Sequence, residues 1–257
     1  MFSHDCVIYE QPANEAIRVC LRLEYLFNKV QHWLEGDKTW DSDAALITML
    51  EILTVLDRPD FKSKLIKEIS HHSSLFKSYQ ALDHVDQSKL AAISCELEKN
   101  IGDLNAMRDR IGQSLYNDKF VHIAYQSLLN PGMGGGFDVA VYHAWLHQPI
   151  DVRKQQLQLW LDNFTVIQKA VRLILYLIRH SSVPKRQIAH KGVYQANGFS
   201  GKSICQLVQV AVDLNAGVYP QISVGRHGFA VQFLKFDIQG SLPVSDDVSF
   251  RLTYCFV

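Results

Sequence analysis

The chain has 257 residues, and its 26 Lys and Arg balance its 26 Asp and Glu, so the net charge is zero at neutral pH. This length is enough for one large domain, or two smaller ones, with a buried core. Proteins that bind nucleic acids or membrane surfaces usually carry a basic excess, which this chain lacks. We therefore expect a globular protein that neither binds nucleic acid nor inserts into a membrane.

The cysteines indicate a reducing compartment. There are five of them, and no two stand in a C-x-x-C spacing: Cys6, Cys20, Cys95, Cys205 and Cys255. An odd number without such spacing favours reduced thiols, as in the cytoplasm. Residues 1–5 contain no basic region, and no long apolar run follows, so we expect no secretory signal. The longest apolar stretch, 171–178, is far shorter than the roughly 20 residues that span a bilayer.

The N-terminal region predicts a strand followed by a helix. Residues 6–10 have a strand-like composition, and Asn14 is a plausible N-cap for the helix that follows. Because a five-residue strand is not stable alone, we expect it to pair with strands near the C-terminus.

Three cations of this first helix fall on one face. Arg18, Arg22 and Lys29 lie within about 40° of one another on a helical wheel. Like charges one turn apart repel each other. These cations are therefore solvated, paired with Glu15, or available to an anionic partner.

Residues 43–181 show apolar side chains at helical spacing. Four aspartates precede such segments and predict N-caps: Asp43, Asp60, Asp86 and Asp118. A short helix that holds His143 and Trp145 should follow, and then one or two long helices over 151–181. The core candidates of this last segment are Leu157, Trp160, Leu161, Val171, Leu175 and Ile178.

After Pro184 the apolar period changes to two, which predicts strands over 192–195, 204–214, 228–236 and 248–256. A run of helices followed by a run of strands is typical of α+β proteins. We therefore predict an α+β fold in which strand 1–12 packs on the β domain. The mainly helical domain covers 13–184, and the antiparallel β domain covers 185–257.

Three motifs resemble catalytic or cofactor sites but lack necessary parts. Gly198–Ser203 ends like a phosphate-binding loop, but two residues rather than four separate its glycines, and a strand is predicted next, so we expect a hairpin turn. The glycine-rich segment 132–136 follows a helix instead of the strand of a dinucleotide fold. His143 and His147 have zincin spacing, but Ala144 stands where the catalytic Glu belongs. We therefore predict no enzyme activity, no metal and no cofactor.

Several segments, in order along nearly the whole chain, resemble the ZapD family of bacterial cell division proteins. They are residues 12–27, Arg110–Gln113, Phe137–Asp138, His143–His147, Leu177–Arg179, Tyr194–Gly198 and Tyr219–Ser223. The resemblance implies a symmetric homodimer with a helical domain and a β domain. It also implies binding to the C-terminal tail of the tubulin-like FtsZ, bundling of FtsZ filaments, and a cytoplasmic location at the division site.

The resemblance further implies a basic surface that binds the FtsZ tail. Its matching positions are Arg18, Arg22, Arg58, Lys119, His143 and Arg226. The planar guanidinium of an arginine can pair bidentately with a carboxylate. Lys119 stands where a relative carries arginine, which weakens such pairing. In the β domain, Gly228 and Gln232 occupy positions that can be arginine, so the basic cluster is thinner there.

Two other functions stay open at this point. The chain could be an adaptor of the same fold that binds another acidic peptide, or a protein that binds nucleic acid through its basic residues. Nucleic-acid binding would weaken steeply with salt. The pair Lys185–Arg186 is either part of a basic site at the domain junction or a solvated linker.

Overall fold

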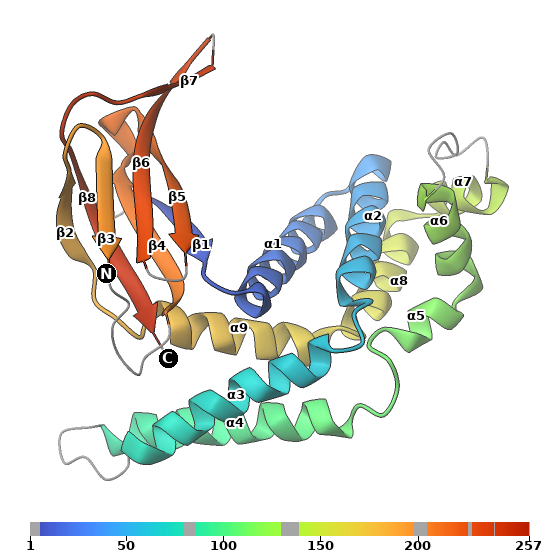
Figure 1. The fold of residues 1–257 in the computed structure, drawn as a ribbon. Helices are drawn as coiled ribbons and strands as arrows, with labels where there is room; N and C mark the ends of the chain where they lie inside the picture. Colours follow the sequence, from blue (N-terminus) through green and yellow to red (C-terminus); the bar gives the residue numbers. More distant parts are fainter. Residues whose placement is uncertain are drawn as a thin grey trace. The chain divides into compact units, whose positions relative to one another are not determined.

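The computed structural model describes residues 6–79, 86–129, 139–197, 205–225, 228–238 and 240–256 (Figure 1). The chain divides into two compact units. The β unit combines residues 1–18 with 175–257, and the helical unit comprises 19–174. The division falls within two helices, α1 (Glu15–Glu35) and α9 (Thr165–Arg179), each of which contributes residues to both units.

Helix α2 (Thr39–Leu56) is the buried helix of the helical unit. Half of its residues are buried, among them Leu46, Met49 and Leu53. Apolar residues occur all round this helix, which is the pattern of a helix that is covered on several sides. Its neighbours in the helical unit include α7 (Ala140–Leu146) and α8 (Ile150–Asp162).

Helices α3 (Phe61–Tyr79) and α4 (Gln87–Ala106) form an antiparallel pair (Figure 1). Near one end, Lys77 and Glu98 form an ion pair with 3.1 Å between Nζ and Oε1. At the other end, the Lys62 ammonium donates to the carbonyl of Met107.

Three predicted N-caps are confirmed. Asn14 accepts a hydrogen bond from the amide of Ile17 at 2.9 Å, and Asp86 accepts one from Lys89 at 3.1 Å. Asp118 accepts one from the amide of Val121 at 3.0 Å, at the start of α6 (Lys119–Leu129). Asp60 stands directly before α3, as predicted.

The predicted cap at Asp43 is wrong, because α2 begins four residues earlier. Asp41 satisfies the helix start by accepting a hydrogen bond from the Lys38 amide at 2.8 Å. The carboxylate of Asp43 is therefore inside the helix, where it accepts a hydrogen bond from the Tyr142 hydroxyl.

The predicted helical segment 151–181 consists of two helices, α8 and α9, which are separated at Asn163 and Phe164. All six predicted core residues of this segment are buried. A further short helix, α5 (Gln113–Asn117), was not predicted. Among the described residues, no helix is long and apolar enough to cross a membrane.

The β unit contains two antiparallel sheets. The first has the order β1 (Cys6–Pro12), β4 (Cys205–Asp213), β8 (Val248–Phe256) and β2 (Lys185–Ala189). Strand β1 pairs with β4 along its whole length, so the predicted pairing of the N-terminal strand with C-terminal strands is confirmed. The predicted α+β class is confirmed as well.

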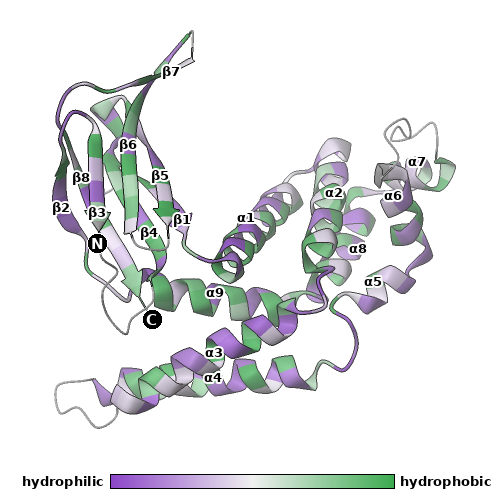
Figure 2. Cartoon of the chain, viewed as in Figure 1, coloured by the Kyte–Doolittle hydropathy of each residue, from purple (hydrophilic) through white to green (hydrophobic). Residues whose placement is uncertain are grey.

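The second sheet has the order β3 (Val193–Asn197), β6 (Gly228–Asp237) and β5 (Val218–Gly225), with β7 (Gly240–Pro243) also paired to β6. The two sheets face each other across a core in which the rings of Phe233 and Phe250 are 5.1 Å apart. Figure 2 shows the hydrophobic residues that these strands contribute. Strands β2, β5 and β7 were not predicted.

The predicted hairpin turn at 198–203 falls on residues that lie outside the described parts of the chain. The described strands before and after this segment, β3 and β4, belong to different sheets. Strand β3 pairs with β6, whereas β4 pairs with β1 and β8.

Candidate partner-binding surface

Arg22 and Lys29 share one carboxylate. Arg22 Nη2 lies 3.0 Å from Glu51 Oε2, and Lys29 Nζ lies 3.8 Å from Glu51 Oε1. Glu51 belongs to α2, so the contact joins α2 to α1. Two cations and one carboxylate leave a net positive charge, and half of the Arg22 side chain is exposed (51%). This group can therefore bind a second carboxylate.

Arg18 is one helical turn before Arg22 on α1, and its side chain is 57% exposed. Its Nε lies 3.5 Å from the Glu15 carboxylate, so the predicted pairing with Glu15 occurs at Arg18. Exposed pairs of this kind are worth roughly 0–1 kcal/mol, which leaves Arg18 able to exchange its partner.

Helix α1 also carries an exposed aromatic side chain beside these cations. The Tyr25 side chain is exposed, and Arg22 Cζ lies 5.5 Å from the centre of its ring. This cation–π contact holds a planar apolar surface next to a charged group. A ligand that has an apolar side chain beside a carboxylate fits both features.

An aromatic cluster fixes the helices that carry Lys119 and His143. The ring of Phe120, next to Lys119, stacks on Trp160 with 5.5 Å between centroids. The same ring lies 6.1 Å from that of Tyr142, which precedes His143. The structure therefore places Lys119 and His143 on adjacent helices, and both side chains are exposed.

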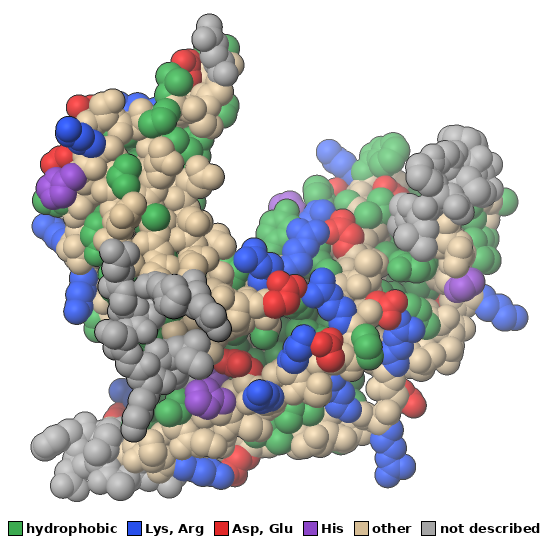
Figure 3. Space-filling model, viewed as in Figure 1, with side chains coloured by type: hydrophobic (Ala, Val, Ile, Leu, Met, Phe, Trp, Pro, Cys, Tyr) green, Lys and Arg blue, Asp and Glu red, His purple; other side chains and the backbone are tan. Residues whose placement is uncertain are grey.

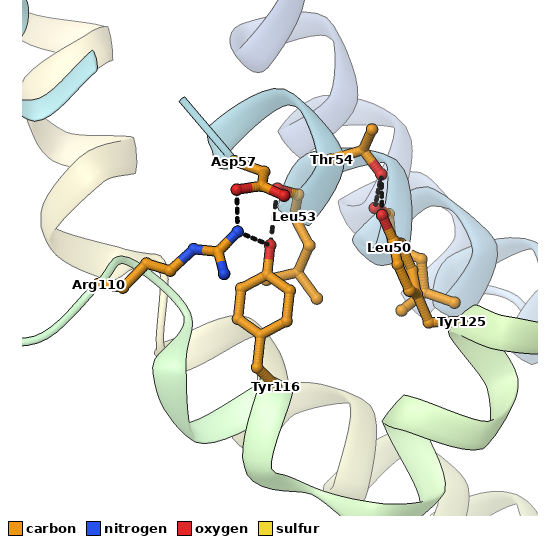
Figure 4. Close-up of polar contacts among 7 residues, drawn as sticks. All are labelled: Leu50, Leu53, Thr54, Asp57, Arg110, Tyr116 and Tyr125. Carbon is orange, nitrogen blue, oxygen red and sulfur yellow. Dashed lines mark hydrogen bonds and ion pairs between the residues drawn. The ribbon is translucent and has the colours of Figure 1, made fainter. Parts of the chain in front are cut away.

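Polar contacts join these helices to α2. The Tyr142 hydroxyl donates to Asp43, and burial together with this carboxylate raises the pKa of Tyr142 far above its usual range, so the phenol stays protonated. Figure 4 shows Tyr125 of α6 beside Thr54 of α2, with 3.4 Å between their hydroxyl oxygens. The Thr54 hydroxyl also donates to the carbonyl of Leu50 at 2.9 Å.

Arg58 follows the end of α2 and is exposed. Asp43, the contact of Tyr142, is near the start of the same helix. The 14 residues from Asp43 to Asp57 correspond to about 21 Å along the helix axis. Arg58 and His143 are therefore associated with opposite ends of α2, and a ligand that reached both would have to be extended.

The β unit supplies less of the predicted surface. Arg226 lies outside the described residues. Gln232 is exposed on β6, at one of the two positions that can be arginine. Lys185 and Arg186 are exposed residues of strand β2, which pairs with β8, so they do not form a linker.

His143 and His147 lie close together, with 4.3 Å between their ring centroids. His147 Nδ1 donates to the carbonyl of His143 at 2.8 Å. In the parts of the chain that the structure describes, no group of three or more His, Cys, Asp or Glu side chains could hold a metal ion.

Three features of this surface are not predicted by the sequence: Glu51 as the shared partner of two cations, the aromatic cluster, and Tyr25. Figure 3 shows Lys and Arg side chains around helix α1 with acidic side chains between them. The surface is thus a mixture of paired charges and not a uniformly basic face. Long-range pairing of this kind has no signal in local sequence.

Comparison with known proteins identifies the family. The model of the family described as "ZapD: Cell division protein" matches residues 21–232. A "Cell division protein ZapD" of Methylococcus capsulatus is 34% identical over 254 residues, which cover 98% of both chains. A protein with the same description from Coxiella burnetii is 31% identical, and the match covers 97% of both chains. Another from Ralstonia pickettii is 33% identical, and the match covers 97% of this chain and 99% of the relative. The chain therefore belongs to the ZapD family of cell division proteins.

Proposed function

We propose that this protein binds the C-terminal tail of FtsZ and, as a homodimer, crosslinks FtsZ filaments into bundles at the division site. The group formed by Arg22, Lys29 and Glu51 carries this proposal, because it holds an excess positive charge on a rigid helix. Membership of the ZapD family supports a role in cell division.

The tail is proposed to bind through several weak contacts. Arg18 and Arg22 supply planar guanidinium groups for carboxylates, and Lys119 and His143 add donors on adjacent helices. Because exposed ion pairs contribute roughly 0–1 kcal/mol each, apolar contact must add to them. Tyr25 offers such a contact beside Arg22.

Bundling follows from the number of binding sites. A protein with one tail site can decorate a filament but cannot join two filaments. A twofold dimer presents two identical sites, and the second binding event gains from the high local concentration. The protein therefore acts by binding, without an enzymatic step, in the cytoplasm where FtsZ assembles.

Tail binding can be tested with a fluorescent peptide that has the C-terminal sequence of FtsZ from the same organism. We expect Arg22→Glu to weaken binding about tenfold or more, because it removes one contact and adds a repulsive charge. Lys99→Glu is the matched control, since Lys99 is an exposed residue of α4 and receives the same change of charge.

Equal binding by the wild type, Arg22→Glu and Lys99→Glu would exclude the proposed surface. No binding by the folded wild type at low salt would exclude the tail as a ligand. In that case, another acidic peptide becomes the next candidate to test.

A further inference from the structure

The helical unit has a cavity of about 500 Å³ beside the end of α2. The start of α3 and the segment that follows α4 form its other walls. The charged lining residues are four cations and two carboxylates, which leave a net charge of two: Arg58, Lys62, Arg108, Arg110, Asp57 and Asp109.

One ion pair of the cavity is already formed and held in place. Arg110 pairs with Asp57, and its Cζ lies 4.1 Å from the ring centre of Tyr116 (Figure 4). The Tyr116 hydroxyl donates to the carbonyl of Leu53 at 3.3 Å. Arg110 therefore forms a structural part of the wall, and its charge is compensated.

Two other cations of the cavity, Lys62 and Arg108, are less compensated. Lys62 donates to the backbone carbonyl of Met107, which carries no net charge, so its ammonium can donate two further hydrogen bonds. Within the described ranges, the exposed guanidinium of Arg108 makes no hydrogen bond or ion pair. Asp109 is the carboxylate of the lining that Arg110 does not neutralise.

The same cavity also has apolar walls. Leu56 and Ile111 contribute nearly buried side chains, and Pro59 contributes its ring. A small inorganic anion would use the cations alone. A peptide that carries a carboxylate beside an apolar side chain would use the cations and the apolar walls together.

We propose that this cavity is an anchoring site for an acidic peptide segment of the partner, with Arg108 and Lys62 as donors to a carboxylate. The inference rests on the proposed function, since it assigns a second contact to the same ligand. Glu51 of α2 and Asp57, the C-cap of that helix, are six residues apart, about 9 Å along the axis and about 120° around it. A peptide that binds Arg22 must therefore also follow the surface partly around α2 to reach the cavity, which takes roughly four to five extended residues.

The fluorescent tail peptide tests this site with the full-length protein. We expect Arg108→Glu to weaken binding about five- to tenfold and Lys62→Gln about two- to fivefold, whereas Lys99→Glu changes it less than twofold. Lys99 precedes Met107 by eight residues, about 12 Å along α4, which makes it a control for total charge. The difference between Arg108→Glu and wild type should disappear for a peptide whose Asp and Glu are replaced by Asn and Gln.

The outcomes separate the two proposals. If the wild type binds the peptide, and Arg108→Glu and Lys62→Gln bind it with the same affinity as Lys99→Glu, the cavity inference is wrong and the proposed function stands. If wild type does not bind, both are wrong. Thermal unfolding of each variant shows whether it is folded, and these exposed or partly exposed side chains should shift the midpoint little.

Discussion

Glu51 competes with the ligand for the cations of α1. Its carboxylate contacts both Arg22 and Lys29, so an acidic peptide must displace it or accept a weakened positive charge. We predict that Glu51→Gln binds the FtsZ tail more tightly than wild type does. Glutamine keeps the size of the side chain and removes only the charge.

The size of this effect follows from the two distances. Coulomb's law in water gives an attraction of about 1.4 kcal/mol for Arg22 and Glu51 at 3.0 Å, and of about 1.1 kcal/mol for Lys29 and Glu51 at 3.8 Å. Desolvation, side-chain entropy and salt reduce exposed pairs to roughly 0.2–1 kcal/mol each. We therefore expect the dissociation constant to fall about two- to fivefold, and the effect to shrink as salt is added.

Fluorescence anisotropy with the tail peptide at two salt concentrations measures this change. The exchange Asp103→Asn is a suitable control, because it also removes one negative charge from the helical unit. Unchanged or weaker binding by folded Glu51→Gln would refute the competition. It would mean that Glu51 serves to orient Arg22 for the ligand.

Three further predictions concern stability. Gly112→Ala should lower the free energy of unfolding, measured by urea denaturation, by about 2–3 kcal/mol. The reason is that Gly112 has a φ of 74° and an added Cβ would lie 2.5 Å from a Leu53 methyl carbon. A loss below about 0.5 kcal/mol would contradict this close packing. Arg179→Ala should cost about 2 kcal/mol, because it removes both hydrogen bonds, at 2.8 and 2.7 Å, that Arg179 makes to the half-buried Glu10 carboxylate; Arg179→Lys should recover part of this loss. Burial lowers the pKa of His72 from 6.5 to about 4. The unfolded state therefore takes up a proton at a higher pH than the folded state does, and the free energy of unfolding should fall as the pH drops from about 6.5 towards 4. Urea titrations at several pH values should show that the free energy of unfolding depends less on pH in His72→Leu.

Short-range features were predicted well. Asn14, Asp86 and Asp118 cap helices because each side chain reaches an amide three residues ahead, which local sequence determines. The alternation in 248–256 identified β8, since Val248, Phe250 and Leu252 are buried at the two-residue period. After Leu252 this period breaks, because Thr253 and Cys255 are buried instead of Tyr254 and Phe256.

Long-range competition explains the errors. Asp43 resembles a cap, but Asp41 is better placed for the Lys38 amide, and Tyr142 supplies a partner from 99 residues away. Strand β2 begins with two exposed cations and lacks a clear apolar alternation, so only its pairing with β8 defines it.

The candidate surface was predicted in its residues but not in its arrangement. Arg22 was expected to be solvated, paired with Glu15, or free for a partner, yet it contacts Glu51, which is 29 residues away. Arg108 and Lys62 come from separate segments and meet only because α3 and α4 form an antiparallel pair. Such juxtapositions depend on tertiary packing, which no local pattern encodes.

The protein is proposed to join FtsZ filaments through their tails. Low-speed co-sedimentation with polymerised FtsZ, with and without its last residues, measures this most directly. We predict that intact filaments pellet together with the protein, while tail-deleted filaments stay in the supernatant. Equal pelleting of both filament types, or of neither at low salt, would contradict tail-dependent crosslinking.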